Sequence, residues 1–180
     1  MAYYESTVGN ELGQTASESG PDSYYSEDGT KPARAWIAAR SRAQSERVSV
    51  RLGVEIGAEI RGDSVRDWFN KALAPSGEKL GRAPKSTGVP GFDLTFCAPK
   101  SVSVLWGFGS ESVRQVVDAA HAQAVSEALS YLSEHAGYTR RADDFDRDLM
   151  VIDRVEALSG VKYEHRTSRA GDPHVHSHVL

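Results

Sequence analysis

The last sixteen residues of the chain, His165-Arg-Thr-Ser-Arg-Ala-Gly-Asp-Pro-His-Val-His-Ser-His-Val-Leu180, are the stretch on which an interpretation of its fold and function rests. Four of the six histidines in the chain lie within it. Histidine is the commonest metal ligand and the usual acid or base near neutral pH. Such a concentration of imidazoles therefore indicates a metal site or an acid–base site.

The alternation in this stretch predicts a strand with His174, His176 and His178 on one face. At about 3.3 Å per residue the outer two lie roughly 13 Å apart, too far to share one ion comfortably. Two histidines from this strand and one from elsewhere make an easier set. His165 supplies the third if the turn-forming segment 170–173 folds its strand back beside the first.

A set of three imidazoles leaves positions on a metal ion open for water or substrate, as in a catalytic site. The alternative is that the histidines are polar side chains on a solvated strand face. Their spacing favours the metal site over this alternative.

A second strand is predicted at Phe92-Asp-Leu-Thr-Phe-Cys97, where residue types alternate strictly. Phe92, Leu94 and Phe96 are expected on the core side. Asp93 would then lie on the opposite face and could point toward the histidines, with an exposed strand carboxylate as the alternative. Lys100 follows at a turn or helix start, where a phosphate contact is physically sensible.

The remaining pattern predicts an α+β fold. Residues 35–47 are compatible with a helix, and 110–136 carry a strong helical period, with Ser112 and Gln115 as a candidate capping box. Strands separated by one long helix, without repeated βα units, favour helices packed on an antiparallel sheet.

Composition bounds the function only loosely. The chain of 180 residues has 21 basic and 25 acidic residues, a net charge of -4 and 39% hydrophobic residues, which suits one domain with its own core. This charge gives no support to nucleic-acid binding, although Lys100, Arg166 and Arg169 bring cations next to the motifs. One cysteine excludes an intrachain disulfide. No run of apolar residues is long enough for membrane insertion, so we expect a cytoplasmic protein.

Residues 1–35 are poor in large aliphatic side chains and are expected to form an N-terminal arm, with residues 36–180 forming the folded domain. The arm contains two tyrosine pairs, Tyr3-Tyr4 and Tyr24-Tyr25. Incidental surface aromatics are the alternative explanation for any single tyrosine. Two pairs in such a polar setting favour a functional role.

The motif His165-(ten residues)-His176-x-His178, the segment Gly91-Phe-Asp-Leu-Thr-Phe-Cys-Ala-Pro-Lys-Ser-Val-Ser103 and the tyrosine pairs resemble MobF/TrwC-type conjugative relaxases of the HUH endonuclease superfamily. The motifs occur in the order of that family and span nearly the whole chain. The resemblance implies an antiparallel central sheet with helices packed on it, a ferredoxin-like or RRM-like palm, and a metal on the central strands.

The resemblance also implies the chemistry. His165, His176 and His178 would bind a divalent cation, Mg²⁺ or Mn²⁺, with Zn²⁺ as an alternative, and Asp93 would orient a ligand histidine or assist deprotonation of a tyrosine. Tyr3 and Tyr24, each the first of its pair, would attack single-stranded DNA at a transfer origin and form a 5'-phosphotyrosine link. The implied partners are that DNA and the conjugation machinery, with a coupling protein and accessory DNA-binding proteins.

The chain departs from the family pattern at both ends. Only Met1 and Ala2 precede Tyr3, where the family has a strand, and the sequence stops two residues after His178. We therefore expect a relaxase palm that is incomplete and truncated at both ends. Two other functions remain open: a noncatalytic remnant that binds single-stranded DNA, and a three-histidine metal-dependent hydrolase unrelated to DNA.

Overall fold

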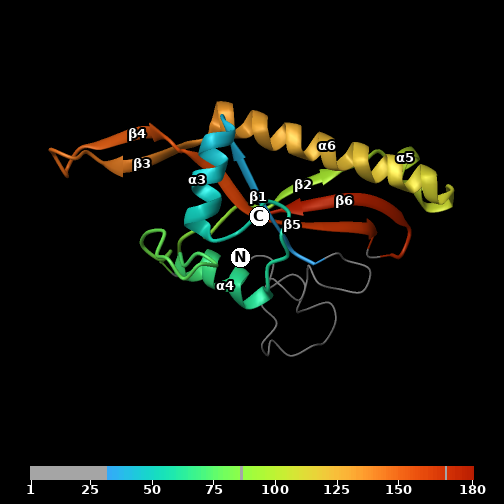
Figure 1. Ribbon diagram of the computed structural model, residues 1–180, viewed down its shortest axis with the longest axis horizontal. Helices are drawn as coiled ribbons and strands as arrows, with labels where there is room; N and C mark the ends of the chain where they lie inside the picture. Colours follow the sequence, from blue (N-terminus) through green and yellow to red (C-terminus); the bar gives the residue numbers. More distant parts are fainter. Residues whose placement is uncertain (1–31, 86, 169) are drawn as a thin grey trace.

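The computed structural model describes residues 32–85, 87–168 and 170–180. Figure 1 shows the arrangement of the elements along the chain. In order they are β1 (Arg34–Ala39), α3 (Arg42–Leu52), α4 (Gly62–Lys71), β2 (Leu94–Cys97), α5 (Lys100–Phe108), α6 (Glu111–Ala136), β3 (Tyr138–Ala142), β4 (Met150–Arg154), β5 (Ala157–Thr167) and β6 (Pro173–Val179).

Four of these strands form one antiparallel sheet in the order β1-β5-β6-β2, and β3 pairs with β4 in a separate two-stranded sheet. The strands β5 and β6 therefore occupy the centre of the larger sheet. Helices pack on this sheet, so the predicted α+β class with an antiparallel sheet is confirmed. The β3–β4 ribbon projects away from the body of the molecule (Figure 1).

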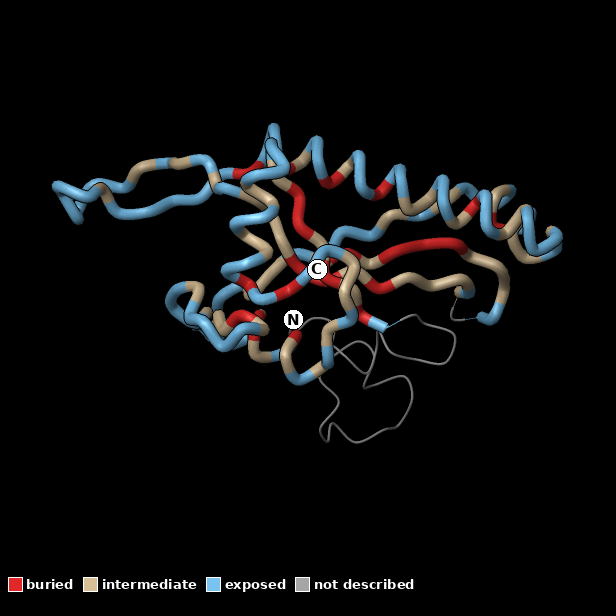
Figure 2. The backbone as a smooth tube through the Cα atoms, in the orientation of Figure 1, coloured by how far each residue is buried: buried red, intermediate tan, exposed pale blue. Residues whose placement is uncertain are grey.

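Each face of the larger sheet has its own apolar core. On one face, Val161 and Tyr163 of β5 pack with α3 and α4, through residues such as Leu52 and Trp68. On the other face, Val179 of β6 packs with residues of α6. Buried residues follow the sheet and the inner side of α6, while the outer side of α6 and most of the β3–β4 ribbon are exposed (Figure 2).

The predicted helix at residues 35–47 is wrong in its first part. Arg34–Ala39 is a strand, and the helix α3 begins only at Arg42, after Ser41 accepts a hydrogen bond from the Gln44 amide at 3.3 Å. The β1 strand is covered on both sides, since Ile37 packs in the α3–α4 core and Ala38 in the α6 core. A strand buried on both faces is a continuous apolar run, which periodicity cannot distinguish from a helix.

The long helix predicted at residues 110–136 is confirmed as α6, Glu111–Ala136. Its N-cap is Ser110, whose hydroxyl accepts a hydrogen bond from the Val113 amide at 3.4 Å. The proposed capping box of Ser112 and Gln115 is wrong, because the Gln115 side chain donates to Glu111 within the helix.

The strand predicted at residues 92–97 begins at Leu94, and its expected core face is only partly buried. Phe96 packs against the α6 core, whereas Phe92 is 77% exposed. The prediction that Phe92 belongs to the core is therefore wrong: alternation marks the faces of a strand but not what covers them.

In the described residues, the helices are all too short or too polar to cross a lipid bilayer.

Candidate metal centre and active site

The pairing of β5 with β6 brings three histidines together. His165 lies directly opposite His176, and Tyr163 lies opposite His178. Because side chains alternate along a strand, His176 and His178 project from the same face as His165. The ladder is irregular between His165 and Thr167, so the site adjoins a local distortion of β5.

The separation of the three rings fits one metal ion. The ring centroids lie 4.9 Å apart for His165 and His176, 5.2 Å for His165 and His178, and 5.3 Å for His176 and His178. Three imidazoles bound to one ion at metal–nitrogen distances of about 2.0–2.1 Å have centroids roughly 4.5–5.3 Å apart.

The nitrogen atoms are not yet converged on one point. Within the part of the chain that the structure describes, no three His, Cys, Asp or Glu side chains form a ready-made cage for an ion. Backbone register fixes where the rings are, whereas their orientation changes by rotation of side-chain torsions. The residues therefore fit a metal ion in kind and in spacing, and binding requires the rings to turn.

Hydrogen bonds define which nitrogen of His176 and His178 can bind an ion. The Nδ1 atom of His176 lies 2.9 Å from the His174 carbonyl oxygen, which can only accept, so Nδ1 carries the proton. The Nδ1 atom of His178 lies 3.1 Å and 3.2 Å from the two oxygens of Asp93 and 3.3 Å from the Thr95 hydroxyl. A neutral ring with its proton on Nδ1 keeps the lone pair on Nε2, as in carboxylate–histidine–metal arrangements.

Burial favours the neutral form of His165 and of His176. It lowers the pKa of His165 from 6.5 to about 4, with further lowering from His176, His178 and Arg166. Burial also lowers the pKa of His176. Metal ions bind the neutral imidazole, so these environments make the lone pairs available at neutral pH.

Asp93 stands next to the histidines because β2 pairs with β6. Thr95 lies opposite His178, and Cys97 lies opposite His176. The Asp93 side chain is well buried beside His178, where its carboxylate accepts a hydrogen bond from Nδ1–H. The structure thus brings together four of the candidate residues of the site.

The cations proposed for DNA contact are placed differently from one another. Lys100, at the start of α5, forms an ion pair with Asp172 and donates to the Pro173 carbonyl oxygen at 3.0 Å, and its side chain stays exposed. The Arg166 side chain is 11% exposed and forms ion pairs with Asp118 at 2.9 Å and Glu164 at 3.2 Å. A phosphate contact by Arg166 would require these pairs to exchange.

Several of the predicted site residues lie outside the described residues. They are Tyr3, Tyr4, Tyr24, Tyr25 and Arg169.

Sequence reasoning missed how the segment 98–107 holds β6. Ser103 is completely buried and its hydroxyl accepts from the Val175 amide at 3.0 Å, while the Ala98 amide donates to the Val175 carbonyl oxygen at 2.9 Å. A methyl group at Gly107 would come within 2.6 Å of Pro173. The serines and the glycine of this segment are small enough for such close packing, but the sequence pattern assigns the segment to a phosphate contact.

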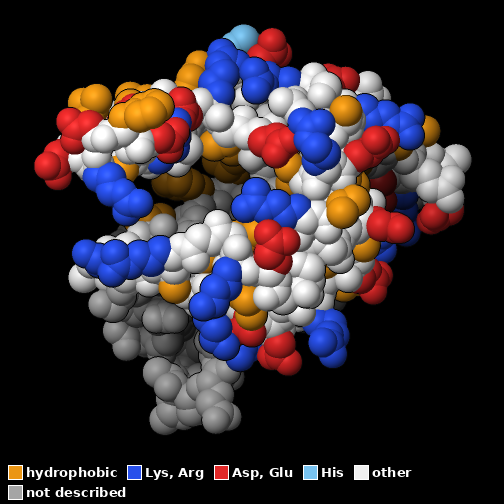
Figure 3. Space-filling view, turned by 60° about the vertical axis from the view of Figure 1, so that its left-hand side comes forward, with side chains coloured by type: hydrophobic (Ala, Val, Ile, Leu, Met, Phe, Trp, Pro, Cys, Tyr) orange, Lys and Arg blue, Asp and Glu red, His pale blue; other side chains and the backbone are white. Residues whose placement is uncertain are grey.

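A segment with three cations precedes Asp93 in the chain. Lys79, Arg82 and Lys85 lie in the exposed segment between α4 and β2, which leads into Asp93, and within the described residues they form no ion pair. Figure 3 shows one face of the molecule with a hollow that has hydrophobic side chains on its floor and Lys and Arg side chains beside it. Cations without carboxylate partners suit contact with a phosphate backbone.

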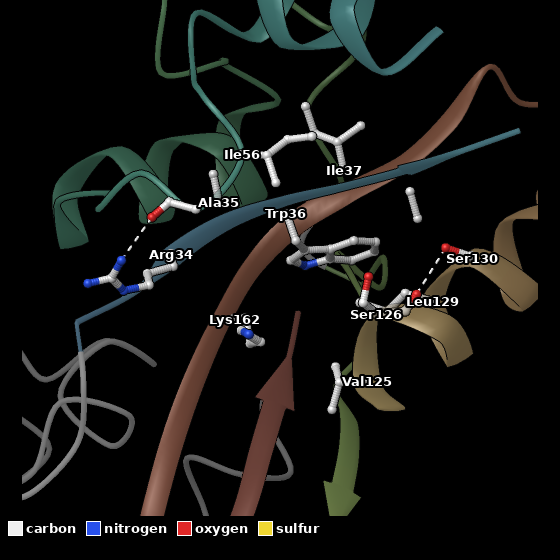
Figure 4. Close-up of a pocket in the computed structure, with 12 residues that line it drawn as sticks. Arg34, Ala35, Trp36, Ile37, Ile56, Val125, Ser126, Leu129, Ser130 and Lys162 are labelled. Atoms are coloured by element: carbon white, nitrogen blue, oxygen red, sulfur yellow. Dashed lines mark hydrogen bonds between the residues drawn. The ribbon is translucent and has the colours of Figure 1, made fainter. Parts of the chain in front are cut away.

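A small pocket lies on the other side of the sheet. It is lined by Trp36 of β1, by Val125 and Leu129 of α6 and by Lys162 of β5 (Figure 4). The Trp36 ring nitrogen donates to the Leu180 carbonyl oxygen at 3.2 Å, and Lys162 is paired with Glu164 at 2.8 Å. The pocket lies toward α6, away from the histidines, and is not part of the candidate site.

Comparison with known proteins agrees with this geometry. The family model described as TrwC relaxase matches residues 1–180. The multifunctional conjugation protein TraI of Escherichia coli is 34% identical over 126 residues, which are 67% of this chain and 7% of that protein. TraI of strain K12 is 32% identical over a segment of the same length. The chain thus spans a small part of these curated relatives.

Solved structures of the conjugative relaxase TrwC with oriT DNA have the same fold. A copper-bound structure has a TM-score of 0.57 and 26% sequence identity. The match covers 87% of this chain and 47% of the TrwC chain. A metal-free structure has a TM-score of 0.60 and 23% identity, and covers 87% of this chain and 49% of that one. The predicted relaxase fold is confirmed, and the chain belongs to the TrwC relaxase family.

Proposed function

We propose that this chain is a conjugative DNA relaxase domain that nicks one strand at a transfer origin and rejoins it by transesterification. The observation that carries this proposal is the cluster of His165, His176 and His178, with Asp93 holding the Nδ1 proton of His178. Family membership supplies the substrate class that a histidine cluster alone would leave open. A hydrolase unrelated to DNA accounts for the cluster but not for the tyrosine pairs.

The proposed reaction exchanges one phosphodiester for another. The hydroxyl oxygen of Tyr3 or Tyr24 bonds to the scissile phosphorus, the bond from phosphorus to the 3'-oxygen breaks, and the leaving oxygen takes up a proton. The products are a 5'-phosphotyrosine and a free 3'-hydroxyl, so the strand can be rejoined. Tyr4 and Tyr25 are the second members of the pairs. A second nucleophile allows a second strand transfer.

The residues around the histidines would prepare this step. A divalent ion held by His165, His176 and His178 would supply charge stabilisation at the scissile phosphate. Asp93 keeps His178 in the tautomer that presents Nε2, or assists removal of the tyrosine proton, whose pKa of about 10 makes a neutral hydroxyl a poor nucleophile. We propose Mg²⁺ or Mn²⁺ as the ion, with Zn²⁺ as an alternative.

We propose single-stranded DNA at a transfer origin as the substrate and the conjugation machinery, including a coupling protein, as the partner. Lys100, Arg166 and Arg169 are the proposed phosphate contacts, and Lys79, Arg82 and Lys85, which form no ion pair within the described residues, would add to them. The segment before β1 would act as the arm that carries the tyrosines, and the palm would begin with β1, Arg34–Ala39. The reaction would take place in the cytoplasm.

Metal binding tests the histidine assignment. Titration with Mn²⁺, followed by calorimetry, should show one site, and His165→Ala, His176→Ala or His178→Ala should each lower the affinity at least about tenfold. His174→Ala is the matched control, because His174 lies on the same strand face outside the set of three. If His174→Ala proved as damaging as His176→Ala, the assignment would be wrong.

Covalent chemistry tests the relaxase activity. A cognate single-stranded oligonucleotide incubated with the protein and Mg²⁺ or Mn²⁺ should give a shifted protein–DNA band on a denaturing gel. Changing all four tyrosines of the pairs to Phe removes only the oxygens and should abolish the band. A band that persists would refute the tyrosine mechanism. Metal binding without any band in the unchanged chain would favour the noncatalytic DNA-binding remnant.

A further inference from the structure

The three histidines of β6 do not by themselves specify the register of the strand. His174, His176 and His178 repeat every two residues. A slip of β6 by two residues would place His174 opposite His165 and His176 opposite Tyr163, where His176 and His178 now lie. We call this arrangement the slipped register. It keeps side chains on the same faces and still offers two histidines to His165, but it moves His178 into the place of Leu180, which pairs with Val161 in the α3–α4 core. Residues other than the histidines must therefore choose between the registers.

The opposite face of β6 does distinguish the two registers. Val179 packs in the apolar core with Val125 and Leu129, while the Ser177 hydroxyl lies 3.0 Å from the His121 ring nitrogen in α6. In the slipped register Ser177 would enter the apolar core and Val175 would face His121. The buried Ser177 hydroxyl and the half-buried His121 ring would then lose each other as partners, which disfavours the slip.

Pro173 also distinguishes the observed register of β6 from the slipped register. In the slipped register it would take the position of Val175, whose amide donates to the fully buried Ser103 hydroxyl at 3.0 Å. Proline has no amide proton, so this hydrogen bond could not form, and a proline would stand inside a central strand. Pro173 also lies against Gly107, so moving it would disturb the contact between α5 and β6.

We infer that Pro173 and Ser177 are positioning residues that select His176 and His178, rather than His174 and His176, as the two histidines that join His165. The inference rests on the proposed function, because it concerns which histidines serve the metal. His174 is then a spare ligand that the register keeps out of the site. Neither positioning residue touches the ion; they act through Ser103 and His121.

The test moves the dependence of metal binding from one histidine to another. In the otherwise unchanged chain, His178→Ala should lower Mn²⁺ affinity at least about tenfold. In the double variant Pro173→Ala, Ser177→Val, the same substitution should cost less than about threefold, because the slipped register supplies His174 in its place. Adding His174→Ala should then remove the remaining affinity. A merely structural role would lower affinity in every background without exchanging the required histidine.

The matched control is the double variant Pro173→Ala, Ser177→Thr. Thr has nearly the shape of Val but keeps a hydroxyl for His121, so the dependence on His178 should return. The second readout is the contact between β2 and β6 in the metal-free protein, measured by nuclear Overhauser effects. Thr95 should contact the His178 ring in the unchanged chain and the His176 ring in the slipped register.

Mn²⁺ affinity and the Thr95 contact together distinguish a failure of the proposed metal site from a failure of the inferred register selection. If no variant binds metal, the proposed metal site fails, while the Thr95 contact still shows whether the register has moved. If Thr95 stays beside His178 in the Val variant and the cost of His178→Ala is unchanged, the inference is overturned. Should the double variant not fold, Pro173→Ala and Ser177→Val are measured singly: a shifted contact in either supports the inference, and no shift in both overturns it.

Discussion

At the scale of single residues, Asp93 is the side chain whose removal should be most informative. Asp93→Asn keeps the shape and one acceptor oxygen but removes the charge that holds the Nδ1 proton of His178. We expect Mn²⁺ affinity to fall roughly tenfold or more, because partners of this kind orient a ligand histidine and raise its basicity.

The control for this prediction is Thr95→Val, which removes the hydroxyl at 3.3 Å from the same ring nitrogen and leaves the carboxylate in place. Calorimetry on both variants compares a charged with a neutral partner. Equal effects of the two substitutions would contradict a special role for Asp93.

The histidines also make stability depend on pH. The pKa of His165 is about 4 in the folded chain, below its ordinary value of 6.5, because of burial. Between these values the unfolded chain binds more protons than the folded one. The free energy of unfolding is therefore highest above pH 6.5 and falls as the pH decreases toward 4.

Urea unfolding in the presence of a chelator, at about pH 7, 6 and 5, measures this dependence. His165→Gln should flatten it, and His135→Gln, at an exposed position, is the control for exchanging a histidine. A pH dependence that survives His165→Gln intact would assign the effect to other groups, with the buried His176 as the first to examine.

At the scale of elements, the contact of α5 with β6 depends on Gly107. A methyl group there would lie 2.6 Å and 2.9 Å from two carbons of Pro173. Gly107→Ala should therefore push the helix from the strand and lower the free energy of unfolding by about 1–3 kcal/mol. Ser101→Ala, at an exposed position of the same helix, is the control for denaturant unfolding; equal stability of the two variants would mean that the helix shifts freely.

The β3–β4 ribbon presents one face with a tyrosine and two arginines, which under the proposed function we expect to contact DNA. Tyr138, Arg140, Ile152 and Arg154 share this face by register, and Arg154 lies 5.1 Å from the Tyr138 ring. Two-stranded ribbons fit the groove of a duplex. Arg140→Ala should weaken binding to an oligonucleotide that contains a hairpin more than to an unpaired one, and reduce its salt slope by about 1. Thr139→Ala, on the opposite face, should have no such effect in fluorescence anisotropy.

At the scale of the whole molecule, local charge matters more than the net charge of -4. The affinity for single-stranded DNA should fall less steeply with salt when Lys79, Arg82 and Lys85 are changed together to Ala. The slope of log affinity against log salt should become smaller in magnitude by about 2, because each lost phosphate contact accounts for roughly 0.7 of it. Filter binding over a range of salt measures this slope. An unchanged slope would show that the DNA runs elsewhere.

The histidine positions could be predicted from the sequence because the period of a strand is fixed by covalent geometry. The faces of β6 and of β2 follow directly from alternation, which is how Asp93 could be related to His178. The environment of the cations could not be predicted in this way. Arg166 looks available in the sequence, yet Asp118, its partner, comes from a helix 48 positions earlier.

Contacts with residues far away in the chain also explain why the strand β1 was predicted to be part of a helix. Trp36 and its neighbours look like one apolar run until the two layers that cover them are known. Phe92 shows the converse, an apolar side chain whose covering layer is missing in the described residues. Pairing and covering both depend on residues far away in the chain, and one sequence without relatives contains no record of such distant pairs.

Cys97 is a natural labelling position for measuring the binding of a metal ion or of DNA. It is the single cysteine of the chain, it is exposed, and it lies opposite His176 on β2. A maleimide dye would therefore attach at one position, beside the histidines, without any prior mutagenesis. Quenching or enhancement of that dye would report the arrival of an ion or a DNA strand in real time. Thiol-reactive reagents used during purification would conversely modify the edge of the site.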